Sequence, residues 1–455
     1  MIHVEVLDTS DLGDRSYVAH DGEQAVVIDP QRDIDRVEQV LADRSLRCVA
    51  VLETHMHNDY VTGGLELARR MDAHYVVNAD DPVQFEREGV SDEDQLTFGT
   101  MRITALATPG HTVTHLSYFF EDVAGVADPG PAAVFTGGSL LYGSVGRTDL
   151  VDVARTDELT RAQFHSARRL ADLPDDARVF PTHGFGSFCS SGSAAGGDSS
   201  TIADERSRND ALTAADEDSF VATLIANLTA YPAYYAHMGP RNLEGPGPVD
   251  LSLPELVDAE QLRKRLDARE WVVDLRDRMA YAAEHLEGSI GIELSNQFST
   301  YLGWLIPWGS SLTLIGESPE QVTEAQRQLV RIGIDRPDAA AIGGPADLSA
   351  GDDVERYDVA TFADLADLTD AARAELTVLD TRRDDERAAG SIPGSAHIPL
   401  HALLKRLDEV PDGPLWVHCA SGFRASIAAS LLARAGHDVT LIGDEYAKTA
   451  ALGLA

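Results

Sequence analysis

Metal-ligating side chains recur at alternate positions in the run Thr-His-Met-His-Asn-Asp-Tyr at residues 54–60. The run follows an apolar stretch at 48–52 that is typical of a buried strand. Alternate residues of an extended segment point the same way, so we expect His55, His57 and Asp59 to reach one small volume beyond the strand end. Imidazole nitrogens and carboxylates are ligands of divalent metals. The spacing therefore predicts a metal site.

Two further apolar strands are predicted to end near histidine. Pro-Gly-His-Thr at 109–112 interrupts a β-rich stretch and carries His111, and Pro-Thr-His-Gly at 181–184 follows an apolar run and carries His183. Three strand ends thus offer imidazoles to the same site. His115, four residues after His111, is interpreted as a structural hydrogen-bonding residue.

A second kind of chemistry is predicted near the C-terminus. The run Trp-Val-His-Cys-Ala-Ser-Gly-Phe-Arg at 416–424 has the pattern of a strand, a tight loop and a helix beginning near Ala425. Backbone N–H groups of such a loop, together with the helix dipole, stabilise an anion at its centre. A thiolate there can accept a sulfane sulfur as a persulfide. Cys419 is therefore predicted to carry sulfur, with Arg424 closing the loop.

The C-terminal half contains an internal repeat. Val-Asp-Leu-Arg at 273–276 matches Leu-Asp-Thr-Arg at 379–382, which indicates two copies of one α/β module. The register places Gly316 opposite Cys419 and Gln321 opposite Arg424, so the first copy cannot form a persulfide there. We expect it to be a spacer or docking surface. The Pro- and Gly-rich stretch 240–254 is interpreted as a linker, which gives domains at 1–245, 253–345 and 358–455.

The histidine motifs, in this order and spacing, resemble those of the metallo-β-lactamase fold. Gly-Arg-Thr-Asp at 146–149 and the run 200–206 are similar to its persulfide dioxygenase and glyoxalase II branch. The repeat with its Cys419 loop resembles a tandem rhodanese, and the whole chain therefore resembles the rhodanese-fused persulfide dioxygenases. The resemblance implies an αββα sandwich followed by two α/β rhodanese modules, the first without the catalytic cysteine.

Two departures from the family pattern bear on the metal. Tyr60 stands where the family has the last histidine of His-x-His-x-Asp-His, and Gly138 stands where it has an aspartate ligand. Both changes weaken the second metal position, so a dinuclear hydrolase site is not expected. The resemblance implies one metal ion. We predict that His57 joins His55 and His111 to hold it in place of the lost aspartate.

Asp59 and His183 complete the predicted metal group, as a further ligand or as residues that orient the ligands. Fe(II) is favoured because three imidazoles leave positions open for sulfur and oxygen, and Zn(II) is the alternative because it also accepts three histidines.

Three neighbours are candidate substrate-binding residues. Tyr60 either donates a hydrogen bond to substrate or fills space. Arg147 either pairs with Asp149 to brace the site or binds a substrate carboxylate. Cys189 either acts as a thiol relay near the pocket or only packs against its neighbours. Cys48, within an apolar strand, is interpreted as an inert core residue.

The implied reaction is the oxidation of a small thiol persulfide, or another sulfane sulfur donor, by O2 to sulfite, coupled to sulfur transfer through Cys419. One alternative is a mononuclear zinc thioester hydrolase resembling glyoxalase II. The other is a non-oxidising sulfurtransferase scaffold in which Cys419 is the only active centre.

Composition limits the partners. The 455 residues include 37 basic and 75 acidic side chains, a net charge of -38, which would repel nucleic acid and anionic membranes. An acidic surface with only three lysines resembles proteins of salt-loving archaea. Three scattered cysteines predict no disulfide framework. With no basic-then-apolar leader and no apolar run long enough to span a bilayer, we expect a soluble cytoplasmic protein. By analogy with the fold, we expect a homo-oligomer.

Overall fold

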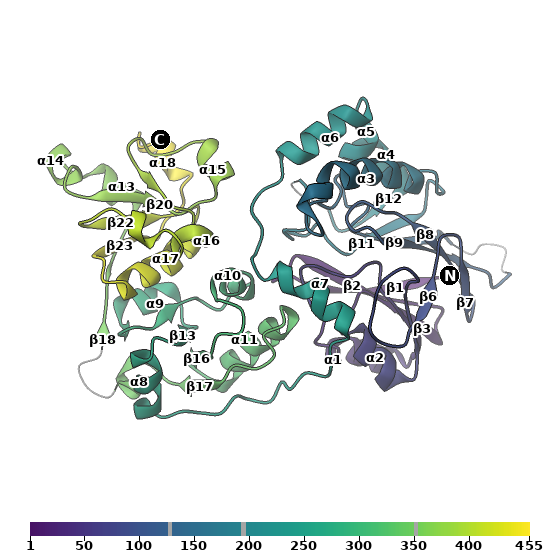
Figure 1. Cartoon of the computed structure of the whole chain (residues 1–455), viewed down its shortest axis with the longest axis horizontal. Coiled ribbons are helices and arrows are strands. Elements are labelled where there is room, and N and C mark those ends of the chain that lie inside the picture. Colours follow the sequence, from purple (N-terminus) through teal and green to yellow (C-terminus); the bar gives the residue numbers. More distant parts are fainter. Residues whose placement is uncertain (126–129, 193–196, 350–353) are drawn as a thin grey trace. The chain divides into compact units, whose positions relative to one another are not determined.

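The computed structural model describes residues 1–125, 130–192, 197–349 and 354–455, and it divides into two units. Figure 1 shows the chain coloured along its sequence. The first unit comprises Met1–Val249 with Val330–Gly333, and the second comprises Asp250–Leu329 with Ile334–Ala455. The run at 190–200 is rich in Ser, Gly and Ala, a composition typical of a loop, and its residues 193–196 lie outside the described part of the chain.

The first unit contains two six-stranded sheets, each with its strands in sequence order. The first sheet consists of β1 (His3–Thr9), β2 (Asp14–His20), β3 (Gln24–Ile28), β4 (Arg47–Leu52), β5 (His74–Asn78) and β6 (Glu88–Val90). The second consists of β7 (Gln95–Phe98), β8 (Met101–Ala107), β9 (Leu116–Asp122), β10 (Ala133–Gly137), β11 (Arg178–Pro181) and β12 (Ser200–Thr201).

Side-chain alternation along the strands explains why these two sheets pack together. In β3, Val26 and Ile28 lie in the core between the sheets, whereas Ala25 and Val27 face the helices. Successive side chains of a strand point to opposite faces, so a strand that is apolar on both faces must be covered on both. The sheet that contains β3 is therefore an inner layer, with the other sheet on one face and helices on the other.

Helices cover the outer faces (Figure 1). The first sheet is covered by α1 (Asp35–Arg44) and α2 (Gly64–Met71), whose apolar residues join its outer core. The second is covered by α3 (Thr156–Leu170), which follows the short η1 (Val153–Arg155), and by α4 (Ile202–Arg208), α5 (Asp210–Thr213) and α6 (Glu217–Ala226). α7 (Tyr235–Glu244) follows. The predicted αββα sandwich is confirmed.

The strand ends that carry the histidines meet at one edge of this sandwich. β4 pairs in parallel with β3 and β5, and β10 pairs in parallel with β11. The segments after β4 and β11 and the connection between β8 and β9 converge there. Gly137, with φ +53°, ends β10 in a conformation that favours glycine, and a β-carbon on it would lie 2.5 Å from Thr54 Oγ1.

The second unit contains two parallel sheets, with strand orders β15-β13-β16-β17 and β19-β23-β22-β20-β21. The first comprises β13 (Trp271–Asp274), β15 (Ile290–Gly291), β16 (Leu312–Gly316) and β17 (Ala339–Ile342). The second comprises β19 (Asp358–Ala360), β20 (Thr377–Asp380), β21 (Ala396–His397), β22 (Leu415–His418) and β23 (Val439–Ile442). A small antiparallel pair joins β14 (His285–Leu286) to β18 (Val354–Glu355).

The helices of the first sheet are α8 (Ala259–Asp267), α9 (Arg278–Ala283), α10 (Phe298–Leu305), α11 (Pro319–Arg331) and α12 (Pro345–Leu348). Those of the second are α13 (Phe362–Ala366), α14 (Asp370–Arg373), α15 (Asp384–Ala388), α16 (Leu400–Leu403), η2 (Leu407–Glu409), α17 (Phe423–Arg434) and α18 (Lys448–Ala451).

The two sheets repeat the same register. Asp274 pairs with Ile315 across β13 and β16, and Asp380 pairs with His418 across β20 and β22. In each module the Arg two residues after this Asp, Arg276 or Arg382, donates a hydrogen bond of 2.7 Å from Nη2 to the Asp carboxylate. Gly316 therefore occupies in the first module the place that Cys419 occupies in the second.

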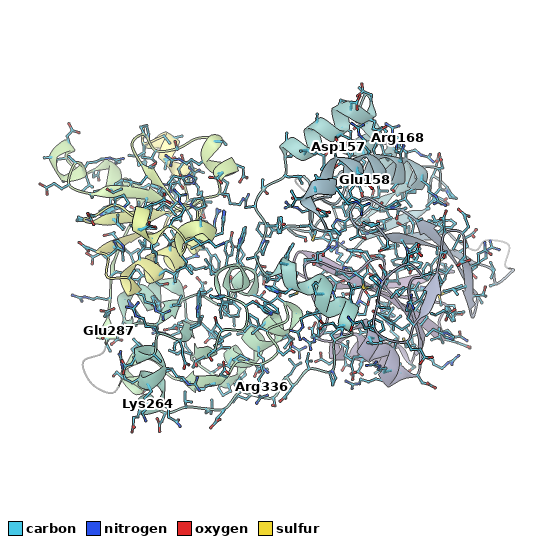
Figure 2. All side chains as sticks on the ribbon, in the orientation of Figure 1. Asp157, Glu158, Arg168, Lys264, Glu287 and Arg336 are labelled. Carbon is cyan, nitrogen blue, oxygen red and sulfur yellow. The ribbon has the colours of Figure 1, made fainter. Side chains whose placement is uncertain are left out.

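Charged side chains such as Lys264 and Asp157 lie on the outside (Figure 2). Lys264 bonds to Glu260 at 2.8 Å and Arg161 bonds to Asp157 at 3.0 Å, both one helical turn apart. Exposed pairs of this kind contribute little to stability. Among the residues that the structure describes, no helix is long and apolar enough to cross a membrane.

Candidate functional site

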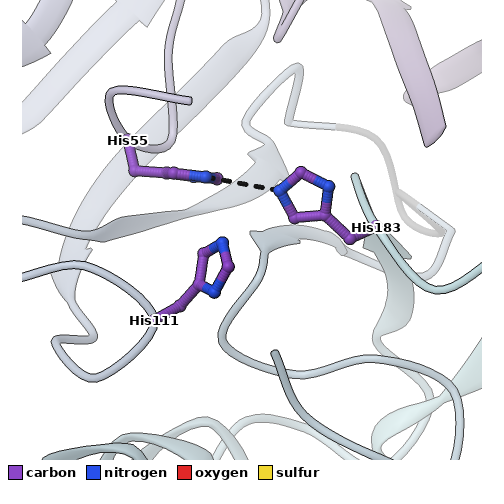
Figure 3. A group of neighbouring side chains, drawn as sticks. All are labelled: His55, His111 and His183. Atoms are coloured by element: carbon purple, nitrogen blue, oxygen red, sulfur yellow. Dashed lines mark hydrogen bonds between the residues drawn. The ribbon is translucent and has the colours of Figure 1, made fainter. Parts of the chain in front are cut away.

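Three histidines from the three strand ends face one another (Figure 3). They are His55 after β4, His111 between β8 and β9, and His183 after β11. One ring nitrogen of each lies within 4.8 Å of the other two, and all three side chains are buried. Nε2 of His55 lies 3.3 Å from Nε2 of His183. Buried imidazoles at this separation form a metal-binding cluster.

The ring of His55 is oriented through Nδ1. Thr54 Oγ1 lies 2.9 Å from that nitrogen and donates its own proton to Asp29 Oδ2 at 2.7 Å. Because the hydroxyl proton is used on Asp29, Thr54 can only accept from His55. Nδ1 of His55 therefore carries the proton, and Nε2 presents a lone pair.

His111 and His183 are oriented in the same way. Nδ1 of His111 lies 2.7 Å from the carbonyl oxygen of Arg147, and Nδ1 of His183 lies 2.8 Å from Asp14 Oδ1. A carbonyl or carboxylate acceptor at one ring nitrogen is the usual support of a metal-ligating histidine, because it leaves the other nitrogen free to coordinate.

The cluster fits a metal ion. Nε2 of His111 has no hydrogen-bond partner among the described residues, although it is fully buried. Nε2 of His55 and Nε2 of His183 face each other across 3.3 Å and form a hydrogen bond in the absence of a metal. A buried polar atom without a partner costs free energy, and a cation between the three nitrogens removes that cost.

His57 is turned the other way. Its Nε2 lies 2.9 Å from the hydroxyl of Tyr60 and 3.3 Å from both Asp29 Oδ1 and Glu53 Oε2. Burial lowers the pKa of this imidazole, but the carboxylates of Asp29 and Glu53 outweigh burial and raise the pKa of His57 to about 9. His57 is thus engaged through Nε2 in a buried polar network beside the cluster, whereas its buried Nδ1 has no hydrogen-bond partner among the described residues.

Asp59 links the two groups. It forms a second cluster with His57 and His183, in which one ligand atom of each lies within 4.8 Å of the others. Asp59 Oδ2 is 3.2 Å from His183 Nδ1. All five predicted metal residues therefore gather in one buried region, but His57 is grouped with Asp59 and His183, whereas His55 and His111 are grouped with His183.

Gly138 accommodates the ring of His111. A β-carbon at position 138 would lie 2.3 Å from Cδ2 and 2.5 Å from Cγ of that ring. A β-carbon on Gly146 would lie 2.7 Å from His111 Nδ1. The imidazole thus lies against two glycines and fills the space that a side chain at position 138 would need.

Arg147 braces the site. Its Nε and Nη2 each donate to a different carboxylate oxygen of Asp149 at 2.7 Å, and Nη1 donates to the carbonyl oxygen of Phe188 at 3.2 Å. The side chain is 2% exposed. These contacts favour the bracing interpretation over binding of a substrate carboxylate. Tyr60 is fully buried with its hydroxyl on His57, which favours a structural role for it too.

The two cysteines of this unit are protonated. Burial, followed by the nearby carboxylates of Asp59 and Asp14, raises the pKa of Cys189 well above its usual value. Burial raises the pKa of Cys48 to about 12. A thiol without thiolate character is a poor nucleophile, so packing is the better interpretation of Cys189.

Sequence reasoning missed the supporting residues. Asp14, Asp29 and Glu53 lie beside the histidines, and Gln163 on α3 accepts the backbone N–H of His111 at 2.8 Å. Asp29 follows the apolar strand β3 directly, a signal of the same kind as the one that identified the histidines. Gln163, within a helix, carries no such signal.

The sulfur loop has the predicted form. β22 ends at His418, Cys419 follows, and Gly422, with φ +88°, precedes α17. The N–H of Gly422 donates to Cys419 Sγ at 3.2 Å, and Arg424 Nη2 donates to Glu386 Oε1 at 2.7 Å. One backbone N–H group, that of Gly422, therefore faces the sulfur.

α10 of the Cys-less module covers this loop. The ring of Tyr301 lies 5.7 Å from that of Phe423 at 62°, and Trp304 stacks on His401 at 4.9 Å and 16°. Burial is the main reason that the pKa of Tyr301 is raised. The charge of Arg424 lowers this pKa, and the nearby Cys419 raises it. The first module thus forms part of the wall around Cys419.

Comparison with known proteins agrees with this architecture. Residues 12–183 match the metallo-beta-lactamase superfamily, and residues 361–448 match the rhodanese-like domain. A metallo-beta-lactamase structure from Staphylococcus aureus subsp. aureus COL aligns with a TM-score of 0.66 at 26% identity, covering 75% of this chain and 99% of that one. The chain therefore carries a metallo-beta-lactamase domain followed by a rhodanese-like domain.

Its homologues are enzymes of two activities. The mitochondrial persulfide dioxygenase ETHE1 of Homo sapiens is 26% identical over 246 residues, which cover 53% of this chain and 80% of that protein. Hydroxyacylglutathione hydrolase of Prochlorococcus marinus (strain MIT 9303) is 34% identical over 165 residues, 36% of this chain. The match spans only 60% of that hydrolase's length.

Proposed function

We propose that the chain is a persulfide dioxygenase with a fused sulfurtransferase. The reaction is RSSH + O2 + H2O → RSH + SO3²⁻ + 2 H⁺, in which the sulfane sulfur loses four electrons and O2 gains them. The observation that carries the proposal is the combination in one chain of the buried histidine cluster and the Cys419 loop. Similarity to a persulfide dioxygenase over most of that relative's length supports it.

The residues of the cluster have distinct tasks. The strand-end histidines would hold one metal ion, with Fe(II) favoured over Zn(II). When bound, iron supplies open positions for sulfur and O2 and the electron chemistry between them. Asp14 and Asp59 hold the ring of His183, and the carbonyl of Arg147 holds that of His111. Burial of all these groups keeps bulk water from the site.

Cys419 would handle the sulfane sulfur. Its thiolate takes the terminal sulfur of a persulfide, Cys–S⁻ + RSSH → Cys–S–S⁻ + RSH, and the N–H of Gly422 lies ready to stabilise the anion. Sulfite can then take that sulfur, Cys–S–S⁻ + SO3²⁻ → Cys–S⁻ + S2O3²⁻. Fusion raises the effective concentration of the intermediate shared by the two reactions.

Two alternatives remain proposals. A mononuclear zinc thioester hydrolase is favoured by the hydroxyacylglutathione hydrolase relatives, but Tyr60 and Gly138 stand where ligands of a second metal are expected. A sulfurtransferase scaffold with no metal chemistry would leave Cys419 as the only active centre. A cytoplasmic, high-salt setting and a homo-oligomer stay predictions from composition and analogy.

The experiment is O2 consumption by iron-loaded protein supplied with a small-thiol persulfide, with sulfite measured as product. Uptake of one O2 per persulfide supports the proposal. Hydrolysis of an acyl thioester by the zinc-loaded protein without any O2 uptake would favour the hydrolase, and sulfurtransferase activity alone would favour the scaffold.

A further inference from the structure

We propose that Asn242 on α7 is a positioning residue of the metal site, because its side-chain amide fixes the loop that carries His57 and Asp59. This inference rests on the metal dependence of the proposed function and deepens it, since it adds a residue on which metal binding depends. Asn242 lies beyond residues 12–183, the part of the chain that matches the metallo-beta-lactamase superfamily. It also falls in the stretch 240–254, where the sequence favours a linker.

The amide of Asn242 is bonded entirely to the backbone of this loop. Its Nδ2 donates to the carbonyl oxygens of His57 and Tyr60, both at 2.9 Å, and its Oδ1 accepts the N–H of Thr62 at 3.0 Å. Asn242 is 1% exposed, so bulk water does not compete for these bonds. Buried backbone groups need partners, and here one side chain supplies a partner to three of them.

Two donors and one acceptor at this position require an amide. The carboxylate of an aspartate could accept from Thr62, but it would face the carbonyl oxygens of His57 and Tyr60 without a proton to donate. Alanine would leave all three backbone groups without this partner. The conformation of the loop therefore depends on the chemistry of residue 242 and not only on its size.

α7 is a fixed support for this amide. Leu243, the next residue, packs against the apolar layer that α1 and α2 form, and its carbonyl oxygen accepts the N–H of Gln84 at 2.9 Å. Three residues before Asn242, a β-carbon on Gly239 would lie 3.1 Å from Asn58 Oδ1, so the helix passes close to the loop. Asn242 thus connects the loop to an anchored helix.

The loop in turn presents an imidazole to the metal group. His57 forms a group with Asp59 and His183 in which one ligand atom of each lies within 4.8 Å of the others. Nδ1 of His57 is buried and has no hydrogen-bond partner among the described residues. Because Asn242 holds the carbonyl of His57 itself, loss of the amide frees the backbone that carries this ring. A metal must then order the loop as it binds, which lowers its affinity.

The test is cobalt(II) binding by the full-length apo-protein in high salt, without O2 or persulfide. Affinity and the visible Co(II) spectrum are measured for the wild type and Asn242→Ala, and urea unfolding shows whether each protein is folded. We expect Asn242→Ala to weaken Co(II) binding about 10- to 100-fold, the usual effect of losing a residue that orients a ligand, and to shift the visible bands. An affinity and spectrum equal to those of the wild type would overturn the inference.

Asn209→Ala is the matched control. Asn209 is a fully buried asparagine of the same unit, whose Nδ2 donates to the carbonyl oxygens of Leu141 and Ser144 at 3.1 and 2.7 Å and whose Oδ1 accepts the N–H of Ala211 at 3.1 Å. It bonds to backbone groups of the same kinds as Asn242 does, but none of them belongs to a residue of the metal groups. We expect Asn209→Ala to be destabilised as Asn242→Ala is and to keep the Co(II) affinity of the wild type.

A milder variant tests the same point should Asn242→Ala not fold. Asn242→Ser keeps one donor and one acceptor, and we expect it to bind Co(II) more weakly than the wild type. An unchanged affinity in Asn242→Ser would overturn the inference.

Equal loss of affinity in Asn209→Ala and Asn242→Ala would also overturn it, because metal binding would then follow general stability. Co(II) binding in the expected order by a chain that takes up no O2 would leave the role of Asn242 standing and reject the proposed function, so the two failures are distinguishable.

Discussion

The imidazole ring of His111 lies against Gly138 so closely that a β-carbon at position 138 would stand 2.3 Å from the ring. The ring cannot move away freely, because its Nδ1 is bonded to the Arg147 carbonyl and its backbone N–H to Gln163. We therefore expect Gly138→Ala to displace the ring.

Gly138→Ala should weaken metal binding at least about tenfold and lower the free energy of unfolding by about 1–3 kcal/mol, as overpacking does. Gly247→Ala is the control, since a β-carbon there meets no atom within 4 Å. Metal titration and urea unfolding measure both effects. A metal affinity equal to that of the wild type in Gly138→Ala would show that the His111 ring can accommodate a β-carbon at position 138, and would contradict this prediction.

Cys419→Ser should separate the two proposed activities. Sulfur transfer from thiosulfate to cyanide is expected to fall at least about 1000-fold, because a hydroxyl cannot carry a sulfane sulfur. O2 uptake on an externally supplied persulfide should stay within about twofold, since Cys419 does not belong to the metal groups. His111→Ala should give the reciprocal result. A loss of both activities in either variant would argue against two independent centres.

Tyr301→Ala should open the site around Cys419. Tyr301 is 5% exposed and packs edge-on against Phe423 of the sulfur loop. We expect alkylation of Cys419 by a bulky maleimide to accelerate at least about tenfold. A tenfold acceleration corresponds to an activation free energy that is lower by about 1.4 kcal/mol. Iodoacetamide, which is small, should react at nearly the wild-type rate.

Leu452→Ala, at an exposed position of the same unit, is the control for this experiment. Equal acceleration by both reagents would indicate general loosening of the loop, and no acceleration would mean that α10 does not limit access.

Asp81 should make stability depend on pH. Burial raises the pKa of its carboxyl to about 6, although the hydrogen bond from Thr114 opposes this. The folded chain therefore keeps this proton up to about pH 6, whereas the unfolded chain loses it near pH 4. Between these values the folded state binds more protons, so its stability falls as the pH rises, by about 3 kcal/mol in all.

Asp81→Asn removes this contribution. The difference in unfolding free energy between the variant and the wild type should grow from pH 4 to pH 6 and then stay constant. Urea unfolding at several pH values in high salt measures it. A difference that does not change with pH would show that Asp81 is ionised throughout.

The sequence predicts the fold well because the motifs sit where strands end. The apolar run at 48–52 appears as β4 (Arg47–Leu52), and the αββα sandwich is confirmed. Cys419 and the tight turn before α17 follow from local pattern alone, because the loop is built from consecutive residues.

The sequence does not determine which nitrogen of each histidine faces the site. That depends on acceptors far along the chain, such as Asp14 for His183 and the Arg147 carbonyl for His111. The same holds for Gln163, which reaches His111 only because α3 packs on the second sheet. Contacts of this kind arise from tertiary packing and leave no periodic signal.

Persulfide oxidation at the histidine cluster is tested by O2 uptake of anaerobically purified, iron-loaded protein. We expect one O2 consumed and one sulfite formed per persulfide in the Cys419→Ser variant, and no uptake when His111 is replaced by alanine. Iron-loaded, folded protein that binds persulfide but consumes no O2 would contradict it.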